Sequence, residues 1–503
     1  MFRSLITNTL ISGFAFVVSA LVPLLLVPLL IGSFGIVQYG IIVITRILLP
    51  TGTFAIFDFG NSEIATQAMA QARHDDDWLR AGRTLRCLGK YTLITGLVVG
   101  LALFAGAHFL GELLNVPPEY QESFARIVIA TSLAFPLLLT ATIGEGILKG
   151  LEAFRRFRTV DVSNAALYGL LALAIIWRGL PFAWVALAYI FTMTLRAAVI
   201  LTIALRMLRQ RGVRFLVARP EERADVRRRS LAMAGNRVLS ATQAQGAPML
   251  ISALLSPSAV GLYDVITRVP RFFKSVTGLM NAAVLPLSAR LDAANDEAGM
   301  RRLGELGLLA VSIATAPICA WCVVFSEPLL RLWIDAHFAS FWVWQAIMFI
   351  VPLANAMTSF GGGALLSRTH VVKQLNLVAL VQIVLQFALA LTCMRWFDER
   401  AFILGQCVAV LVTFPVQMYI IAREKQLGLP AFRRIFAMVA SLCAATAAGL
   451  AFHFGSFVQS PVTLIASFAL WLGATALLIW LALLHASERR AILGMLSSIT
   501  GTR

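Results

Sequence analysis

The stretch "LISGFAFVVSALVPLLLVPLLI", residues 10–31, contains no charged side chain. At 1.5 Å per residue, a helix of ~20 apolar residues crosses the ~30 Å hydrocarbon core of a bilayer. The run is longer than the ~7–15 residues of a signal-peptide core and is not followed by an A-x-A cleavage site. We therefore interpret it as a retained first membrane helix.

Segments of this kind recur along the whole 503-residue chain, which is 59% hydrophobic and only 13% charged. Soluble domains carry roughly 25% charged residues. The apolar runs are continuous and lack the two-residue alternation of barrel strands. We predict an all-α polytopic membrane protein with about 14 membrane helices, at approximately 8–32, 40–67, 91–112, 123–148, 160–178, 182–206, 231–255, 259–289, 304–326, 341–366, 375–395, 402–422, 435–455 and 461–485.

The loops between these segments alternate in charge. One set, which includes "ARHDDDWLRAGRTLRCLGK" (72–90) and "RQRGVRFLVARPEERADVRRRS" (209–230), holds about 30 Lys and Arg, and the other set about four. An excess of Lys and Arg in short loops marks the cytoplasmic face, so both termini are predicted to be cytoplasmic. The net charge of +17 lies in these short loops, and nucleic-acid binding is not predicted.

A weak internal repeat suggests two halves. "PLLIGSFGIVQYGI" (28–41) and "LISALLSPSAVGLYDVI" (250–266) both run from an apolar helix through a turn of small residues to a Tyr and a new helix. Parallel repeats of this kind are a transporter architecture with the substrate site between the halves. We predict a central cavity and four parts: an N-terminal six-helix half (1–206), a basic cytoplasmic linker (207–230), a C-terminal six-helix half (231–422), and the last two helices with a cytoplasmic tail (423–503).

Charge interrupts one predicted membrane helix at "GLYDVITRVPRFFKSV" (261–276), which carries Asp264, Arg268, Arg271 and Lys274. These residues share one helix face, and Arg271 lies ~20 Å from the predicted outer surface. A charge at that depth costs ~2.5–3.5 kcal/mol, so the face should turn to the protein interior or to water. Pro270 is predicted to bend the helix. Asp264 can neutralise only one cation, which favours a cationic, water-filled cavity over a closed internal ion-pair network.

The first half contributes further charged residues at membrane depth. The repeat places Arg46 on the helix that corresponds to that of Arg271, and Arg196 lies near the midplane. We predict an anion-binding cavity that contains Arg46, Arg196, Arg268, Arg271 and Lys274. The carboxylates of Asp58, Asp264 and Glu145 could couple transport to a proton or sodium gradient, or could orient the arginines. Glu145 is also spaced to pair with Lys149 one turn away.

Motifs for catalysis are missing from the sequence. It has no Walker A motif, no HExxH and no cluster with metal-ligand spacing, and its outer loops hold few carboxylates. We predict a transporter with no cofactor and no metal site rather than a membrane glycosyltransferase or ligase. Cys319 and Cys322 form a CxxC spacing inside an apolar segment, which favours a packing role.

Several stretches together resemble one family. "NTLISGFAFVVSALVPLLLVPLLIGSFGIVQYGI" (8–41) resembles the opening of Wzx-type polysaccharide flippases of the MOP exporter superfamily. Further similarities to that family follow in the same order along the chain: "FDFGNSEIATQAMAQ" (57–71), "ILKGLEAFRRF" (147–157), "SAVGLYDVITRV" (258–269) and "EPLLRLW" (327–333).

The resemblance implies an activity and partners. The expected activity is translocation of a polyprenyl-diphosphate-linked oligosaccharide, an O-antigen or exopolysaccharide repeat unit, across the bacterial inner membrane by alternating access. Membrane lipid, a polysaccharide polymerase and a chain-length regulator would be the partners. The family's cationic lumen would correspond to Arg46, Arg268, Arg271, Lys274 and Arg196. The predicted seventh helix, "TQAQGAPMLIS" (242–252), lacks an acidic residue that related sequences often carry. A lipid II-type flippase and a MATE-like drug/cation antiporter are the alternatives.

Overall fold

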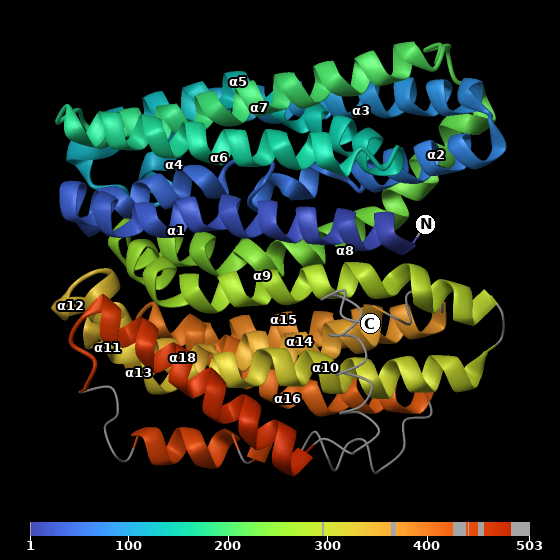
Figure 1. Ribbon diagram of the computed structural model, residues 1–503. Coiled ribbons are helices and arrows are strands. Elements are labelled where there is room, and N and C mark those ends of the chain that lie inside the picture. The colour runs from blue at the N-terminus through green and yellow to red at the C-terminus, as the bar shows by residue number, and fades with distance from the viewer. Residues whose placement is uncertain are drawn as a thin grey trace. The chain divides into compact units, whose positions relative to one another are not determined.

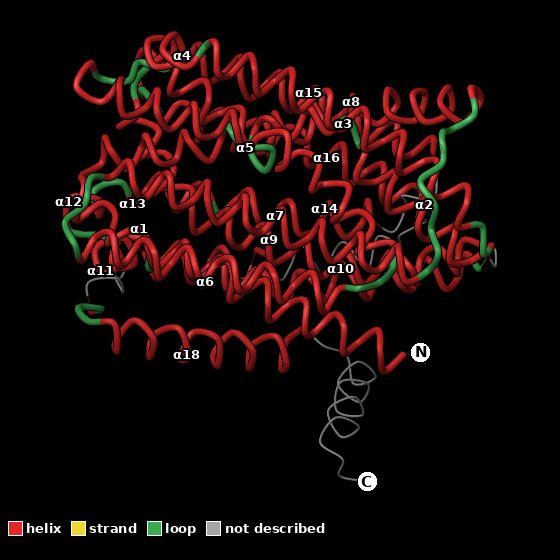
Figure 2. Tube along the Cα trace, turned by 90° about the horizontal axis from the view of Figure 1, so that it is seen from above, coloured by secondary structure: helices red, strands yellow, loops and turns green. Residues whose placement is uncertain are grey.

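The computed structural model describes residues 2–293, 296–363, 369–425, 439–440, 442–450 and 457–483. All the regular elements in these ranges are helices, as Figures 1 and 2 show, and none is a strand. Nine helices within the same ranges are long and apolar enough to cross a membrane. The prediction of an all-α polytopic membrane protein is confirmed, whereas the total of about 14 helices stays a prediction.

Contacts between helices divide the chain into two compact units. The first contains Met1–Arg268 and Phe387–Phe402, and the second contains Val269–Gln386 and Ile403–Arg503. The predicted part boundaries at 206, 230 and 422 stay predictions. The range 207–230 contains the end of one helix, an irregular segment and the first turns of the next helix.

The first helix of the first unit, α1 (Phe2–Ile47), has one break. Gly35 has φ 77° and ψ 170°, which a residue without a Cβ adopts at little cost, and it lies within the turn predicted between the first two membrane helices. The predicted continuous helix 40–67 is wrong. After Ile47 the chain forms a turn, the 3₁₀ helix η1 (Thr53–Asp58) and α2 (Asn61–Asp75). Phe59 and Gly60 have φ of 48° and 75°, and such left-handed residues end a right-handed helix.

The remaining helices of the first unit pack closely. They are α3 (Trp78–Ala105), α4 (Ala107–Leu113), α5 (Pro118–Gly150), α6 (Phe154–Trp177), α7 (Phe182–Gln210), α8 (Pro220–Leu254) and the start of α9 (Pro257–Ala293). Helix α5 packs against α2, α3 and α7, while α1 packs against α6 (Figure 1). Small residues make this possible, since a Cβ on Gly100 would lie 2.7 Å from the carbonyl oxygen of Ser132.

The second unit begins within α9 and continues through the helices that follow it in the chain. They are α10 (Glu297–Val324), α11 (Ser326–Trp333), α12 (Ala336–Ala339), α13 (Trp342–Met348), α14 (Ile350–Gly363), α15 (Thr369–Phe397), α16 (Arg400–Lys425), α18 (Pro461–Leu478) and the π-helical η3 (Ile479–Leu483). Residues Phe387–Phe402 of α15 and α16 belong to the first unit. Helix α10 packs against α14 and α18, and Trp471 of α18 donates a hydrogen bond to the Pro317 carbonyl (2.9 Å). Residues 439–440 and 442–450 of the predicted span 435–455 are helical, and the rest of that span lies outside the described residues.

The two cysteines of the CxxC spacing lie on α10. Cys319 and Cys322 are both buried and both free thiols. This placement agrees with the packing role that the apolar sequence around them predicts.

Candidate functional site

Two glycines bring α1 and α9 into close contact within the first unit. A Cβ on Gly40 would overlap the carbonyl of Pro257, and a Cβ on Gly261 would lie 2.8 Å from the carbonyl oxygen of Ile36. Because neither glycine has a Cβ, the two backbones can touch. The contact positions Tyr39, next to Gly40, against the charged face of α9.

Tyr39, Asp264 and Arg268 form a hydrogen-bonded group at this contact. The Tyr39 hydroxyl donates to Asp264 Oδ2 (2.6 Å) and accepts from Arg268 Nη2 (3.0 Å). Arg268 also donates to Asp264 through Nε (2.9 Å) and through Nη2. Tyr39 is fully buried and Asp264 nearly so. The face predicted from the sequence therefore contains an ion pair in which the single carboxylate neutralises Arg268.

Arg46 lies on α1 and is held by aromatic rings. Its Nη2 donates to the Tyr168 hydroxyl (2.9 Å), and its guanidinium lies 5.5 Å from the Tyr168 ring centroid and 5.0 Å from that of Tyr189. No carboxylate among the described residues pairs with it, and its buried Nε has no hydrogen-bond acceptor there. Arg46 lies seven positions after Tyr39 on α1, about two helical turns away on the same face. The group therefore holds two arginines and one aspartate, a net positive charge.

Arg271 and Lys274 follow on the next turns of α9. Both side chains are half-buried, and the contacts of this part of the helix place it in the second unit. Helix α9 is continuous on both sides of Pro270. The predicted bend at Pro270 and the predicted cavity around these cations stay predictions.

Arg196 lies in a different charged cluster, between α5, α6 and α7. It donates to Asp161 Oδ1 through Nε (2.9 Å) and Nη2 (2.7 Å), and to Glu145 Oε1 through Nη1 (2.8 Å). Glu145 also accepts from Lys149 (3.3 Å), the pair that the i,i+4 spacing predicts. Two carboxylates therefore pair with Arg196, and they also pair with Lys149 and with Arg158, whose Nη1 lies 3.3 Å from Asp161. Asp161 has no place in the predicted site.

Asp58 is the centre of a third cluster, at the end of η1. Its carboxylate accepts hydrogen bonds from the Ser62 hydroxyl (2.8 Å), the Thr142 hydroxyl (2.7 Å) and Arg237 Nη2 (3.0 Å). Arg237 Nη2 also donates to Glu63 Oε1 (2.6 Å). From the sequence alone, Arg237 lies near a predicted span end, where its side chain could reach water. The structure uses it instead to connect α8 to η1 and α2.

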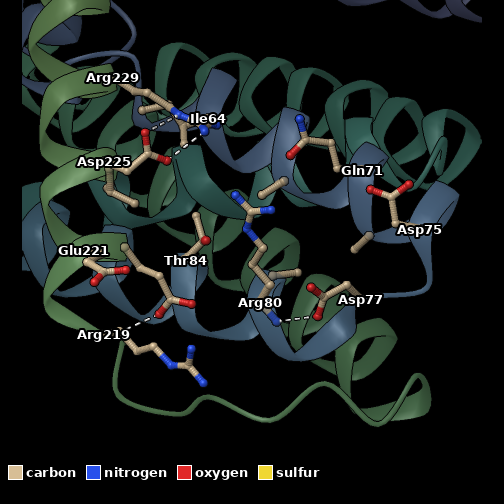
Figure 3. Close-up of a pocket in the computed structure, with 15 residues that line it drawn as sticks. Ile64, Gln71, Asp75, Asp77, Arg80, Thr84, Arg219, Glu221, Asp225 and Arg229 are labelled. Carbon is tan, nitrogen blue, oxygen red and sulfur yellow. Dashed lines mark hydrogen bonds and ion pairs between the residues drawn. The ribbon is translucent and has the colours of Figure 1, made fainter.

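A cavity of about 370 Å³ opens between α2, α3 and the start of α8 (Figure 3). Its apolar part comes from residues such as Ile64 and Val226, and its rim carries side chains of both signs. Arg80 extends toward the middle of the cavity in Figure 3, while Arg229 pairs with Asp225 at the edge (2.7 Å). None of the predicted site residues lines it, so this cavity is separate from the buried clusters.

The first turn of α8, beside this cavity, is capped by a carboxylate. Glu222 accepts from the backbone amide of Arg219 (2.7 Å) and from Arg83 of α3 (3.2 Å). Burial alone would raise the pKa of Glu222, but these hydrogen bonds outweigh burial and hold the pKa below its usual range. Glu222 therefore connects α8 to α3 in its ionised form.

Solved structures show which class of protein shares this fold. The lipid II flippase MurJ in an inward closed conformation aligns over 94% of this chain and 99% of its own, with a TM-score of 0.70 and 10% identity. A multidrug resistance MATE family transporter of the MOP superfamily, facing inward, covers 84% of this chain and 95% of its own (TM-score 0.60, 15% identity). The Vibrio cholerae MATE transporter VcmN in its bent form aligns over 84% of this chain and 98% of its own, with a TM-score of 0.59 and 12% identity. The fold is that of MOP-superfamily transporters.

The family follows from the sequence match. Residues 5–292 match the model of the polysaccharide biosynthesis protein family, and the chain belongs to that family. No curated protein sequence matches the chain. The family and the shared fold confirm the predicted resemblance, and they agree with the prediction of a transporter rather than an enzyme.

Proposed function

We propose that this protein is a flippase that moves a polyprenyl-diphosphate-linked oligosaccharide, an O-antigen or exopolysaccharide repeat unit, across the bacterial inner membrane by alternating access. The family match and the transporter fold support the general activity. The charge pattern of the loops supports an orientation with both termini in the cytoplasm. A polysaccharide polymerase and a chain-length regulator would then receive the flipped unit.

The observation that carries the proposal is the uncompensated positive charge of the Arg46 and Arg268 group. A diphosphate is anionic and offers several acceptor oxygens, and arginine binds such groups through paired hydrogen bonds. Arg46 has a buried Nε without an acceptor among the described residues. In the proposed mechanism the diphosphate accepts from Arg46 and shares Arg268 with Asp264, while the polyprenyl tail stays in lipid. Arg271 and Lys274 extend the cationic path along α9.

We propose a structural role for Arg196. Its guanidinium already donates to two carboxylates from two other helices, Asp161 and Glu145. A diphosphate would have to compete with both carboxylates for the same donors. Arg196 therefore connects α5, α6 and α7, and the anionic substrate binds at Arg46 and Arg268.

The carboxylates predicted to couple transport to an ion gradient have cationic partners. Asp58 accepts from Arg237, Asp264 from Arg268, and Glu145 from Arg196. These pairs support the alternative that the carboxylates orient arginines. Coupling to a proton or sodium gradient would proceed by protonation or ion binding that breaks one of these pairs.

A lipid II-type flippase is the second candidate, because the MurJ structure aligns over nearly the whole chain. In cells that lack this protein, we expect surface polysaccharide to be lost and its lipid-linked precursor to accumulate on the inner leaflet. Wild-type protein and the control variant Arg126→Ala, at an exposed position, should restore export, whereas Arg46→Ala/Arg268→Ala should not. If cells without the protein instead failed to export the cell-wall precursor, the second candidate would be favoured. Normal export by the double variant at normal abundance would remove the substrate site proposed here.

A further inference from the structure

The segment that joins α7 to α8 exposes three adjacent apolar side chains, Phe215, Leu216 and Val217, between two buried ends. We call these three residues the apolar crest. Val213 and Ala218 are only 7% and 5% exposed, and they pack into the apolar core of the first unit. Between them, Phe215, Leu216 and Val217 are 39%, 41% and 62% exposed. A polar linker that only joins two helices would not need to present three adjacent apolar side chains.

Two contacts with α3 fix the position of the crest. Arg86 Nη1 donates to the carbonyl of Phe215 (2.8 Å). A Cβ on Gly82 would overlap the carbonyl of Arg214, so the segment lies directly on the helix surface. The crest is therefore held in one place by its buried ends and by α3.

The crest lies at the depth of a membrane interface. A run of exposed apolar side chains on α3 begins at Leu93 and continues to Phe104, and Leu79 at the start of the helix is exposed as well. Arg86 precedes Leu93 by seven positions, about 10 Å along a helix. Trp78, one of the residues that favour the headgroup level, lies at the start of α3, with the guanidinium of Arg211 5.3 Å from its ring. Phe215 therefore lies just outside the lipid-facing part of α3.

Cations surround the crest. Arg209, Arg211, Arg214 and Arg219 are all exposed, and residues 207–220 contain no Asp or Glu. Apolar side chains flanked by exposed arginines match a surface that presents phosphates above hydrocarbon. A purely zwitterionic lipid surface would give these arginines no net charge to bind.

We propose that residues 209–219 form a binding site for anionic phospholipid. Phe215, Leu216 and Val217 enter the boundary between headgroups and acyl chains, and the four arginines bind lipid phosphates. The site requires this segment to lie on the cytoplasmic leaflet, as the proposed orientation has it, and does not depend on which substrate is moved. It holds the first turns of α8, which follow the crest directly, at the membrane surface.

The test places an environment-sensitive fluorescent amino acid at Leu216 of the full chain, reconstituted in phosphatidylcholine bilayers that contain phosphatidylglycerol. Either lipid is supplied with brominated acyl chains at equal mole fraction. We expect brominated phosphatidylglycerol to quench the label several-fold more than brominated phosphatidylcholine. The same label at Leu180, in the loop between α6 and α7 that belongs to the set of loops with few Lys and Arg, should be quenched equally by both lipids.

A second experiment, on protein without the label, tests whether lipid binding depends on the charge of these arginines. Arg209→Gln/Arg211→Gln/Arg214→Gln should lose the preference for phosphatidylglycerol, and the matched triple Lys variant should keep it. Retained lipid in the purified unlabelled protein, measured by native mass spectrometry, should follow the same order. Equal quenching by both lipids, or no quenching by either because the crest faces water or another protein, would overturn the proposal. Substrate transport is read separately, so failure of the flippase assignment would not change this result.

Discussion

At the residue scale, the half-buried arginines of the first unit differ in how their charge is balanced. Arg196 and Arg268 have carboxylate partners, whereas Arg46 rests on two tyrosine rings and has no carboxylate partner among the described residues. A buried cation without a carboxylate is costly unless another anion approaches it. In the proposed mechanism, Arg46 is therefore the arginine whose charge an anionic substrate would balance.

The hydroxyl of Tyr39 is predicted to stabilise the folded protein. Tyr39→Phe removes a group that donates to Asp264 and accepts from Arg268. A buried hydrogen-bonding group left without its partner costs about 1–3 kcal/mol, so thermal unfolding in detergent should begin at a lower temperature. Tyr419→Phe, at a side chain that is 66% exposed, should leave the unfolding temperature unchanged. Equal effects of the two variants would contradict this role.

Arg196 is predicted to be needed for folding more than for substrate affinity. Arg196→Gln leaves Glu145 and Asp161 without their shared partner. Breaking a fully buried pair costs about 3–5 kcal/mol, and these side chains, which are 14–20% exposed, should cost somewhat less. The amount of folded protein, measured by size-exclusion chromatography, should fall sharply. Arg126→Gln breaks only the exposed pair with Glu122, worth about 0.3–0.5 kcal/mol, and should have little effect. If Arg196→Gln gave the wild-type amount of folded protein but lost transport, Arg196 would be assigned to the substrate site instead.

At the element scale, the contact between α1 and α9 depends on glycine. Gly40→Ala should push α1 away from α9, because the new Cβ would meet the Pro257 carbonyl. Gly32→Ala, on the same helix, has no atom within 4 Å of the new Cβ. We expect Gly40→Ala to lower the unfolding temperature and Gly32→Ala to leave it unchanged or raise it slightly, since Ala favours a helix by about 0.5–1 kcal/mol. The reverse order would show that the two helices do not pack through Gly40.

Because Glu222 caps α8 in its ionised form, the stability of this helix should depend on pH. A lowered pKa in the folded state means that Glu222 stabilises α8 fully above its unfolded pKa of about 4.3, and that this stabilisation is lost as the pH falls below it. Glu222→Gln should remove this dependence, measured as the unfolding temperature between neutral and acidic pH. The neighbouring Glu221→Gln should behave as wild type. An unchanged pH profile for Glu222→Gln would refute the cap.

The sequence predicts most of the elements because long apolar runs in a membrane protein leave few alternatives to a helix. It does not predict the break between Ile47 and Asn61, because Phe59 in a left-handed conformation gives no compositional signal. The turn at Gly35 was predictable, since a glycine follows the first apolar run. Local composition therefore locates helices better than it locates their interruptions.

At the scale of the whole molecule, the sequence predicts local charge pairs and misses distant ones. Asp264 with Arg268 and Glu145 with Lys149 are one helical turn apart, so the spacing alone suggests both pairs. Asp58 and Arg237 are 179 positions apart, and nothing in a single sequence connects them. The tyrosines that hold Arg46 come from α6 and α7, which only the packing of the first unit brings to α1. The predicted set of cations therefore separates into distinct clusters once the helices are packed.

The most direct test of the central claim is transport in proteoliposomes that contain polyprenyl-diphosphate-linked oligosaccharide. Appearance of the sugar on the opposite leaflet would be measured for wild type, Arg46→Ala and the control Arg126→Ala. A charge-assisted hydrogen bond is worth about 1.5–3 kcal/mol, so Arg46→Ala should slow transport about ten- to hundredfold. Arg126→Ala should transport at the wild-type rate. Wild-type transport by correctly folded Arg46→Ala would contradict a diphosphate site built on this arginine.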